Sequence, residues 1–573
     1  MMSRENRKQP FFELLDRLLD ALKARSERKP IRIAGLVLLT LLGGGGLFGA
    51  IYRIFYATAK YQAAMAGESQ QVSLLRDWVN LLLVLLVLSV SALWFDWMVR
   101  KREREADTPL AENKLAAERV QQSSMEAYLD RMTKLLLERE LLTSKPSDAV
   151  QVIARAYTLT ALRTLDGKRK GSVVRFLHDL GLLGKEVIID LVGADLAQAD
   201  LSHAGLTETN LSGVDLCKAS LCMADLRGSS LAQANLSRGD LRGANLSGVN
   251  LTGANLGGAT LHATILSGAN LTESDLSGAN LTQADLRGAN LIKANLSRAT
   301  LSRASLQGTD MRWANLLEAI LPEADLGQAV LLEANLCDAE LTGADLTQAT
   351  LSKADLSGAN LTRANLTGAQ LDGATLAEAN LSGAQLTLAH LESSNLSRAV
   401  LHKAVLCESL LNEAIVTRAD LSEANLQQAD LSRANLRESI LREADLTRAT
   451  LTESNLSLTN LSRAKLTLAI LNDADLSRAN LCEANLRRAK LEHTNLRRAK
   501  LGAADLIGAS LKGADLRDAD LSGAKVSPEQ LAEAASLEGA ILPDGTPHQA
   551  APQAAPSYST LSPSSAMGYN QAS

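Results

Sequence analysis

Residues 279–288 read Ala-Asn-Leu-Thr-Gln-Ala-Asp-Leu-Arg-Gly, which is one five-residue unit written twice. The unit recurs without an insertion or a deletion, because every fifth residue from Leu191 to Leu521 is apolar. All of these residues are Leu except Met311 and Val416. A period of five matches neither the 3.6 residues of a helical turn nor the two-residue alternation of a strand. The sequence therefore predicts a solenoid built from a short repeat.

Two of the five positions in the unit are predicted to face inward. When the regular Leu is called position i, the apolar residues are Leu at i and Ala at i−2. Asp or Asn at i−1 and the variable residues at i+1 and i+2 carry nearly all of the charge. Each buried Leu would contribute roughly 1.5 to 3 kcal/mol, and the small Ala would let the corners of a coil close.

This pattern resembles the pentapeptide-repeat family, and the resemblance covers more than half of the chain. It implies a mainly β fold, a right-handed, four-sided β-helix with one unit on each side and twenty residues in each coil. About 17 coils stacked at roughly 4.8 Å would make a rod on the order of 80 Å long. We assign this β-helix to residues 187–526.

Composition limits the kinds of partner. The 573 residues carry a net charge of −5, and residues 187–526 hold 30 basic and 39 acidic side chains, so the basic excess lies outside the repeat. Trp313 is the only aromatic residue of the repeat. Platforms on which bases could stack are therefore missing, and no nucleic acid partner is expected.

The five cysteines all occupy position i+1, and none has another cysteine twenty residues away, one coil above or below. They are Cys217, Cys222, Cys337, Cys407 and Cys482. A disulfide or a zinc site needs side chains that converge, which this spacing does not provide. Free thiols suit a reducing compartment, and we expect no cofactor and no metal.

The N-terminal third predicts a membrane anchor. Residues 33–52 and 78–95 are two uncharged apolar runs, each long enough to span hydrocarbon. Trp78, Trp94 and Trp97 lie where interfacial anchors are found. We therefore assign residues 31–99 to a transmembrane helical hairpin, the alternative being a pair of core helices. Residues 1–30 form an amphipathic segment that either lies on the bilayer or packs on the protein's own helices.

The basic residues predict the orientation of this hairpin. Lys and Arg cluster before the first run and after the second, and they are sparse in the connection. The positive-inside rule places both termini in the cytoplasm of a bacterium, with the hairpin in the inner membrane. The flanking cluster comprises Arg25, Arg28, Lys29, Arg32, Arg100, Lys101, Arg102 and Arg104.

Residues 100–186 predict a small α-helical neck that caps the first coil. Ser147 is expected to cap a helix that runs to Leu165. Residues 166–171 form a basic turn that is solvated or touches anionic lipid, and a short helix follows it. The face of the first helix expected to be buried comprises Val150, Ile153, Ala154 and Tyr157.

The C-terminal end predicts a second cap at residues 527–545. Ser527, Pro528 and Gln530 form a helix start, with Ser as N-cap and Gln three residues later. This helix should run to about Ser536. Residues 546–573, rich in Pro, Ala, Ser and Gln, predict a disordered tail.

The repeat contains no insertion, so it offers no loops on which a catalytic site could be built. The neck holds no convergent nucleophile, base or metal set either. Oppositely charged residues twenty positions apart, such as Arg418 and Glu438, favour ladders of ion pairs along the rod. An acidic belt lies around Glu333 and a basic belt around Arg497, each interpreted as a solvated face.

One candidate contact surface consists of apolar residues at the outward i−1 position on four consecutive sides of one coil. These are Val400, Val405, Leu410 and Ile415, and the lone Trp313 is a further candidate. They would bind a protein partner or a second copy of the chain, or they reflect β-propensity alone.

These patterns predict a membrane-anchored, non-enzymatic scaffold that presents a rigid cytoplasmic rod for protein–protein interaction. The alternative rests on the resemblance, because pentapeptide-repeat proteins that protect DNA gyrase are thought to mimic duplex DNA. A DNA mimic would need a uniformly negative surface, whereas the charges of this repeat are mixed in sign.

Overall fold

The computed structural model describes residues 70–145, 148–184 and 186–548, without the side chains of residues 70–86 and 102–112. The predicted amphipathic segment, the first predicted span at 33–52 and residues 549–573 of the predicted tail lie outside the described residues. The chain divides into two compact units, Met1–Lys114 and Leu115–Ser573.

Helix α4 covers Gln70–Glu138 and includes residues 78–95, the second predicted span. Trp94 and Trp97 are exposed on it, with Lys101 Nζ 5.2 Å from the ring centroid of Trp97. Within the described part of the chain, no helix combines the length and the apolar character needed to cross a membrane. The transmembrane hairpin therefore stays a prediction.

The neck consists of the end of α4, a short 3₁₀ helix η2 (Leu141–Thr143), α5 (Ala149–Thr164) and α6 (Gly167–Asp179). The N-cap residue of α5 is Asp148 and not the predicted Ser147. The Asp148 carboxylate accepts a hydrogen bond from Lys145 N at 2.7 Å, and it bonds no N–H of the helix.

The predicted buried face of α5 is wrong at two of its four positions. Ile153 and Tyr157 are 43% and 37% exposed, whereas Ala154, Thr158 and Leu162 are buried. The face of α5 that is in fact buried includes the polar residue Thr158, so the sequence did not identify it as a core face. Its hydroxyl donates to Ala154 O and lies 3.1 Å from the hydroxyl of Tyr128 on α4, so a polar residue is accommodated in the core.

The predicted basic turn at residues 166–171 is also wrong, because these residues begin α6. Asp166 is the N-cap residue and accepts a hydrogen bond from Arg169 N. Lys170 is 6% exposed, and its Nζ donates to Asp195 Oδ1 at 2.7 Å and to Ala197 O at 3.2 Å. This lysine binds the first coil of the rod and faces neither solvent nor lipid.

The neck closes the open edge of the first coil. Asp200 N donates to Gly167 O, and Asn210 N donates to Leu183 O, each at 2.8 Å. Arg155 and Arg175 donate to further backbone carbonyl groups of the first units. Backbone groups that have no preceding coil to bond are therefore satisfied by the helices.

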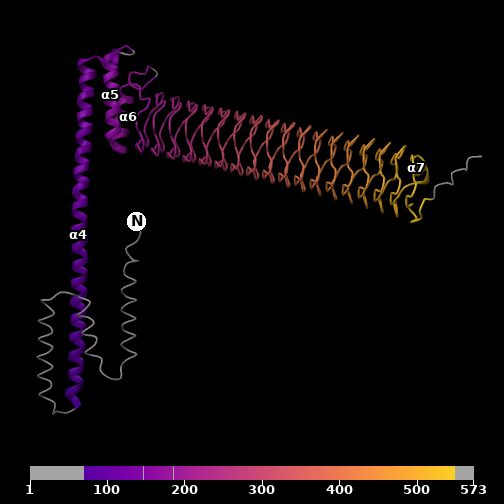
Figure 1. Ribbon diagram of the computed structural model, residues 1–573, viewed down its shortest axis with the longest axis horizontal. Helices are drawn as coiled ribbons and strands as arrows, with labels where there is room; N and C mark the ends of the chain where they lie inside the picture. The colour runs from indigo at the N-terminus through magenta and orange to yellow at the C-terminus, as the bar shows by residue number, and fades with distance from the viewer. Residues whose placement is uncertain (1–69, 146–147, 185, 549–573) are drawn as a thin grey trace, which may run out of the picture. The chain divides into compact units, whose positions relative to one another are not determined.

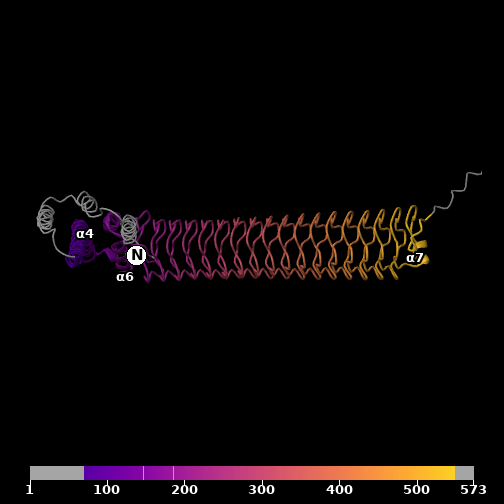
Figure 2. The same cartoon turned by 90° about the horizontal axis from the view of Figure 1, so that it is seen from below.

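The rod is a stack of coils of twenty residues, as predicted. Each i−1 residue forms a parallel bridge to the residue twenty positions later, from Asp195 with Asp215 to Asp505 with Lys525. The coils follow one another without an inserted loop (Figure 1), and the view from below shows the same regular stack (Figure 2). Backbone hydrogen bonds join each coil to the next, for example Leu196 N to Asp215 O at 2.8 Å.

A tight turn follows every Leu. In most units the amide of residue i+3 donates to the carbonyl of Leu, as in Ala199 N to Leu196 O at 3.0 Å. The residue at i+2 is left-handed throughout, with φ between 53° and 63° where it is not Gly. This geometry belongs to type II turns, and each non-Gly residue in it costs roughly 1 to 2 kcal/mol. The amide at i+2 donates to the next coil, which offsets this cost.

The preference for Asp or Asn at i−1 has a local cause. Its side-chain oxygen accepts a hydrogen bond from the backbone N–H two residues later, as between Asp215 Oδ1 and Cys217 N at 3.0 Å. Asn side chains also reach the preceding coil, as Asn235 Nδ2 does toward Asp215 Oδ1 at 2.8 Å. These residues therefore stabilise the turn and the stack.

The core is the inside of the coils. The Leu residues at position i are buried, and so are the exceptions Met311 and Val416 and the Ala residues at i−2, which confirms the inward assignment. Some i−2 positions hold Ser or Thr, whose hydroxyl donates to a backbone carbonyl, as Ser274 does to Leu271 O at 2.7 Å. These polar residues are accordingly accommodated without an unpaired donor.

Helix α7, Pro528–Ala532, begins the C-terminal cap. Ser527 and Gln530 form the predicted capping box, but the helix ends at Ala532 and not near Ser536. Gln530 Nε2 donates to Leu506 O and Ala509 O, both at 2.7 Å. Ser536 and Ile541 then bridge to the last coil, so the strand ladder continues into the cap.

Candidate binding surfaces of the rod

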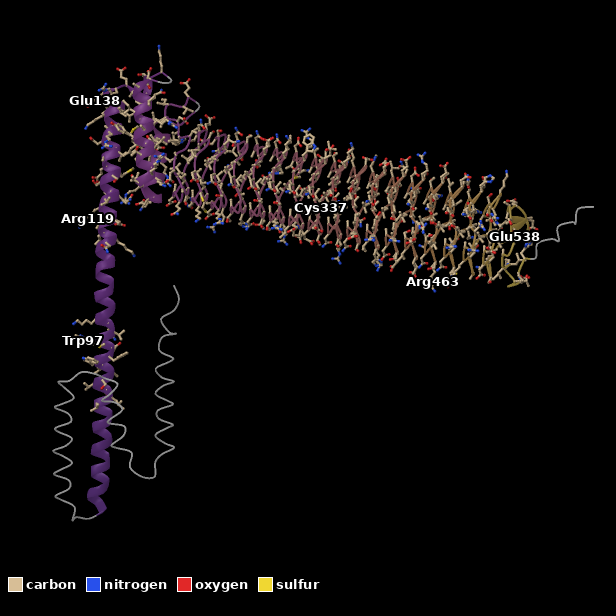
Figure 3. All side chains as sticks on the ribbon, in the orientation of Figure 1. Trp97, Arg119, Glu138, Cys337, Arg463 and Glu538 are labelled. Atoms are coloured by element: carbon tan, nitrogen blue, oxygen red, sulfur yellow. The ribbon has the colours of Figure 1, made fainter. Side chains whose placement is uncertain are left out.

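Many charged residues of the rod form ion pairs with residues one coil away. Residues at i+2 that lie twenty positions apart form ion pairs, as predicted for Arg418 with Glu438 (2.7 Å). Arg298 pairs with Glu318 at 2.8 Å, and Arg463 pairs with Glu483 at 3.0 Å. Charged side chains line the outside of the rod along its length, with Arg463 among them (Figure 3).

A second kind of pair lies within single units. Arg at i+1 forms two hydrogen bonds to the Asp two residues before it, and the side-chain bond from this arginine lowers the pKa of the carboxyl. The pairs are Asp225 with Arg227, Asp240 with Arg242, Asp285 with Arg287 and Asp515 with Arg517. These carboxylates are therefore paired and do not add to a uniform negative field.

The acidic belt around Glu333 does not form one patch. Its members are spread over several sides of the rod, and only Asp325 and Asp345 are bridged to each other in one column. Glu323 pairs with Arg303 at 2.7 Å, and Glu333 Oε2 accepts from Trp313 Nε1 at 3.1 Å.

The four predicted apolar contact residues lie on four different sides of the rod. Val400, Val405, Leu410 and Ile415 bridge to four separate columns of residues. Val400 and Ile415 are 37% and 43% exposed, while Val405 and Leu410 are half-buried. They encircle one coil, so a single flat partner cannot contact all four, and their role stays a prediction.

Trp313 lies several coils away from this ring. The residue is 45% exposed, the guanidinium of Arg312 lies 5.7 Å from the ring centroid, and Nε1 donates to Glu333. The structure therefore does not bring Trp313 together with the other predicted contact residues.

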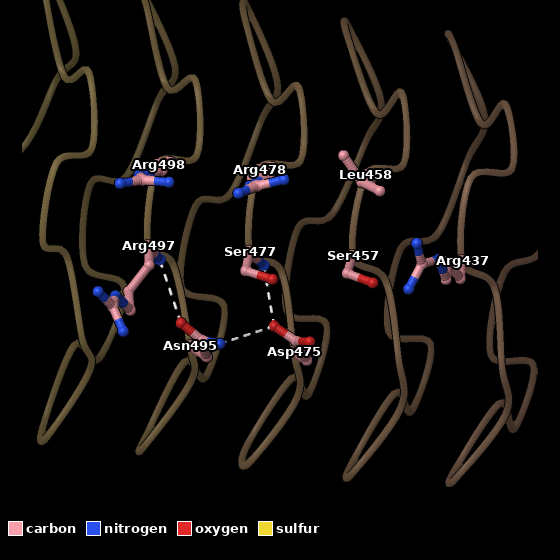
Figure 4. Close-up of a pocket in the computed structure, with 9 residues that line it drawn as sticks. All are labelled: Arg437, Ser457, Leu458, Asp475, Ser477, Arg478, Asn495, Arg497 and Arg498. Carbon is pink, nitrogen blue, oxygen red and sulfur yellow. Dashed lines mark hydrogen bonds between the residues drawn. The ribbon is translucent and has the colours of Figure 1, made fainter.

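One side of the rod is hollowed, with a volume of about 410 Å³. The hollow crosses successive coils (Figure 4). Its lining consists of Arg437, Ser457, Leu458, Asp475, Ser477, Arg478, Asn495, Arg497 and Arg498. We call this surface the arginine hollow.

The hollow arises from a gap in one column of side chains. Arg437, Ser457, Ser477 and Arg497 follow each other at position i+1 with a spacing of twenty. The two small serines form the floor, and the two arginines stand at the ends (Figure 4). Asn495 Nδ2 donates to Asp475 Oδ1 at 2.8 Å, which holds one rim in place.

The arginine hollow carries an excess of positive charge, which the longer-range attraction between Arg497 and the Asp515 carboxylate reduces without forming an ion pair. Arg437 and Arg498 pair with Glu438 and Asp518. The guanidinium groups of Arg478 and Arg497 make no ion pair with any described residue. Asp475 is the one acidic residue of the lining. A carboxylate of a partner could therefore bind here without displacing an existing ion pair.

Sequence reasoning grouped Arg497 with arginines nearby in the chain and therefore missed this hollow. Arg437 and Arg478 lie far from Arg497 in sequence but on the same side of the rod. Comparing i+1 residues at a spacing of twenty would have revealed two serines between two arginines.

A second group that sequence reasoning missed is Asp372, His390 and Glu392. One ligand atom from each lies within 4.8 Å of the others, and no other described His, Cys, Asp or Glu residues form such a group. Burial, together with a hydrogen bond to Asp372, raises the pKa of the Glu392 carboxyl. The expectation that no metal binds considered only columns of His or Cys, and so it did not test this mixed group.

The family model for pentapeptide repeats (8 copies) matches the chain in consecutive segments from 189–222 to 494–527. The comparison with curated proteins finds no match. Several solved structures are similar, and at the TM-scores below these likenesses carry no argument about function.

HetL, a pentapeptide repeat protein involved in heterocyst differentiation regulation from the cyanobacterium Nostoc sp. strain PCC 7120, is 33% identical over 49% of this chain and 91% of its own, with a TM-score of 0.15. QnrB1, a plasmid-mediated fluoroquinolone resistance protein, is 16% identical over 35% and 90%, with a TM-score of 0.24. Rfr23 from the cyanobacterium Cyanothece 51142 is 44% identical over 16% and 58%, with a TM-score of 0.11.

Proposed function

Because the chain belongs to the pentapeptide-repeat family, we propose that it is a non-enzymatic scaffold whose rod binds a partner protein. The family implies a right-handed β-helix, and the unbroken ladder holds each outward side chain at a fixed height along it. We also propose that the apolar runs at 33–52 and 78–95 anchor the chain in the bacterial inner membrane, with both termini in the cytoplasm.

The arginine hollow is the observation that carries the proposal. Arg is enriched in protein interfaces, and its planar group can bind a carboxylate through two hydrogen bonds. Arg478 and Arg497 are the cations of the hollow without an ion pair, and Ser477 on the floor is next to Arg478 in the chain and one coil away from Arg497. The occupant that fits is a segment of a partner protein that carries Asp or Glu. A nucleic acid fits less well, because the repeat has no aromatic residue near the hollow on which bases could stack.

The alternative function, a DNA mimic acting on gyrase, finds less support in the charges. A mimic of duplex DNA needs rows of unpaired negative charge. On this rod, acidic residues such as Glu318, Glu438 and Glu483 pair with arginines of the neighbouring coil. We expect the purified chain to leave DNA supercoiling by gyrase unchanged, and inhibition at stoichiometric concentration would favour the alternative.

The test reverses the free charges of the hollow. Partners are crosslinked in cells, recovered from detergent-solubilised membranes with the full-length chain, and compared with those of the Arg478→Glu, Arg497→Glu double variant. The control is Arg238→Glu, Arg363→Glu, which makes the same charge change at two exposed arginines that form no ion pair with a described residue; like Arg478, both lie at i+2.

The proposal predicts that a specific partner is lost from the hollow variant and kept by the control. Equal recovery with both variants would contradict it. Cell fractionation tests the anchor separately, since removal of residues 1–99 should release the chain from the membrane. A reporter fused after Ser573 that proves extracytoplasmic would contradict the proposed orientation.

A further inference from the structure

Asp372, His390 and Glu392 meet on one side of the rod because of the coil length. Asp372 and Glu392 both occupy position i+1 and lie twenty residues apart, so they stand on adjacent coils. Strands of adjacent coils lie roughly 4.8 Å apart. His390 occupies position i−1 of the same unit as Glu392, and its Nδ1 lies 3.7 Å from Glu392 Oε1.

Acidic residues are stacked one coil apart elsewhere on the rod too, as Glu423 and Glu443 are at i+2. Among the described residues, however, only Asp372 and Glu392 have a histidine whose ligand atom lies within 4.8 Å of both carboxylates. No described Lys or Arg forms an ion pair with Asp372 or Glu392. Glu392 Oε2 is buried and has no hydrogen-bond donor among the described residues. Two carboxylates without a donor between them repel each other unless a proton or a cation lies there.

We propose that Asp372, His390 and Glu392 bind one divalent transition-metal ion such as Zn²⁺. A carboxylate pair supplies oxygen ligands and neutralises the ion, while the imidazole nitrogen favours Zn²⁺ and its neighbours over Mg²⁺ or Ca²⁺. Metal–ligand bonds of about 2.0 to 2.2 Å require small side-chain rotations from the present separation of up to 4.8 Å. The backbone ladder need not change.

Three ligands leave one position of a tetrahedral ion open. His390 is exposed and the two carboxylates are half-buried, so this position faces solvent, where water or a group from another molecule can complete the coordination. The site lies on coils other than those that form the arginine hollow. The inference therefore does not depend on the proposed function.

The test uses the full-length chain in detergent after treatment with a chelator. Zn²⁺ binding is measured by calorimetry, and Co²⁺ is used as a spectroscopic probe. The variants are His390→Ala and Asp372→Asn. The matched control is Glu453→Gln, which removes a carboxylate on the same side of the rod that makes no ion pair with a described residue.

We expect the wild-type chain to bind one Zn²⁺ that both ligand variants bind at least about 10-fold more weakly, since even outer-shell changes cost 10- to 100-fold. The Glu453→Gln variant should bind like wild type. Zn²⁺ should raise the Tm of the wild type and of Glu453→Gln but not that of Asp372→Asn. An ion stabilises the folded state only when it binds there, and the Asp372→Asn variant lacks one of the ligands.

Two results would overturn the inference. One is that the wild-type chain binds no Zn²⁺. The other is that His390→Ala and Asp372→Asn bind it as the wild type does, which would assign the ion to other groups such as the cysteines. Far-UV circular dichroism shows whether each variant is folded. If Asp372→Asn does not fold, Glu392→Gln replaces it, and binding of Zn²⁺ by that variant at wild-type affinity would equally overturn the inference.

Discussion

Gly171→Ala tests whether α6 holds the first coil of the rod. In an exposed helix this change would stabilise by about 1 kcal/mol. Here the added Cβ would lie 1.9 Å from Asp200 O, a backbone atom of the first coil. Asp200 N is itself bonded to Gly167 O at 2.8 Å, so the coil cannot move away without losing that bond.

Inserting a methyl group into a packed contact costs typically about 1 to 3 kcal/mol, and this contact is shorter than usual. We therefore take the upper part of this range, about 2 to 3 kcal/mol, and subtract about 1 kcal/mol for the helix propensity, which leaves a net loss of about 1 to 2 kcal/mol. Coils of a solenoid interact with their neighbours only, so the loss should stay local.

Hydrogen exchange measures this loss directly. Amides in residues 193–211 should exchange about tenfold faster in Gly171→Ala than in wild type, because about 1.4 kcal/mol corresponds to a factor of ten. Amides in residues 480–520 should not change. The control is Gly205→Ala, where the added Cβ meets no atom within 4 Å. Unchanged or slower exchange in residues 193–211 of Gly171→Ala would refute the docking of α6 on the first coil.

Three further predictions concern the rod itself. Leu346 is fully buried, so Leu346→Asp should lower the stability by about 3 kcal/mol or more; a thermal melt like that of wild type would contradict the inward assignment. The pKa values of Asp225, Asp240 and Asp285 are lowered chiefly by the hydrogen bond from a following arginine. Since the folded pKa lies below the unfolded value, their contribution to stability is present above about pH 4 and is lost as the pH falls through the folded pKa. The Tm of the wild type should therefore decrease as the pH is lowered from about 4. This decrease should be less steep in the variant in which all three Asp residues are changed to Asn. The same dependence of Tm on pH in both proteins would contradict the stabilising role of the pairs. Burial, followed by a hydrogen bond with Asp355, raises the pKa of Cys337 to about 11. Its alkylation at pH 8 should be on the order of 100-fold slower than in the denatured chain, and equal rates would contradict this.

The rod could be predicted from the sequence because its determinants are local. Leu at i and Ala at i−2 repeat without a slip, and each fills the interior of its own coil. The left-handed residue at i+2 was not predicted, since Arg, Glu and Gln together occupy this position more often than Gly does and so hide the turn in the sequence. The turn is enforced by ladder hydrogen bonds, which no single unit reveals.

The neck was harder to predict because its packing is not local. Thr158 lies on the buried face of α5 since Tyr128, distant in sequence, approaches its hydroxyl. Gly167 and Gly171 looked like turn residues between basic side chains. Their spacing of four is the signal that a helix face there is flat enough to touch the backbone of the rod.

The two candidate sites were missed because they run across coils. The arginine hollow depends on Ser457 and Ser477 standing between Arg437 and Arg497. The group of Asp372, His390 and Glu392 combines neighbouring residues with one a full coil away. Both become visible only after the sequence is aligned at a period of twenty.

A photo-crosslinking residue at position 477 tests the central claim most directly, with the same residue at position 277 as control. Ser477 and Ser277 lie at i+1 on the same side of the rod, and each amide donates to the Asp two residues before it. Only Ser477 lines the arginine hollow. The account predicts that position 477 crosslinks a segment of a partner protein rich in Asp and Glu, and that Arg478→Glu, Arg497→Glu abolishes this crosslink. The same crosslink at both positions, or one that survives the charge reversal, would contradict it.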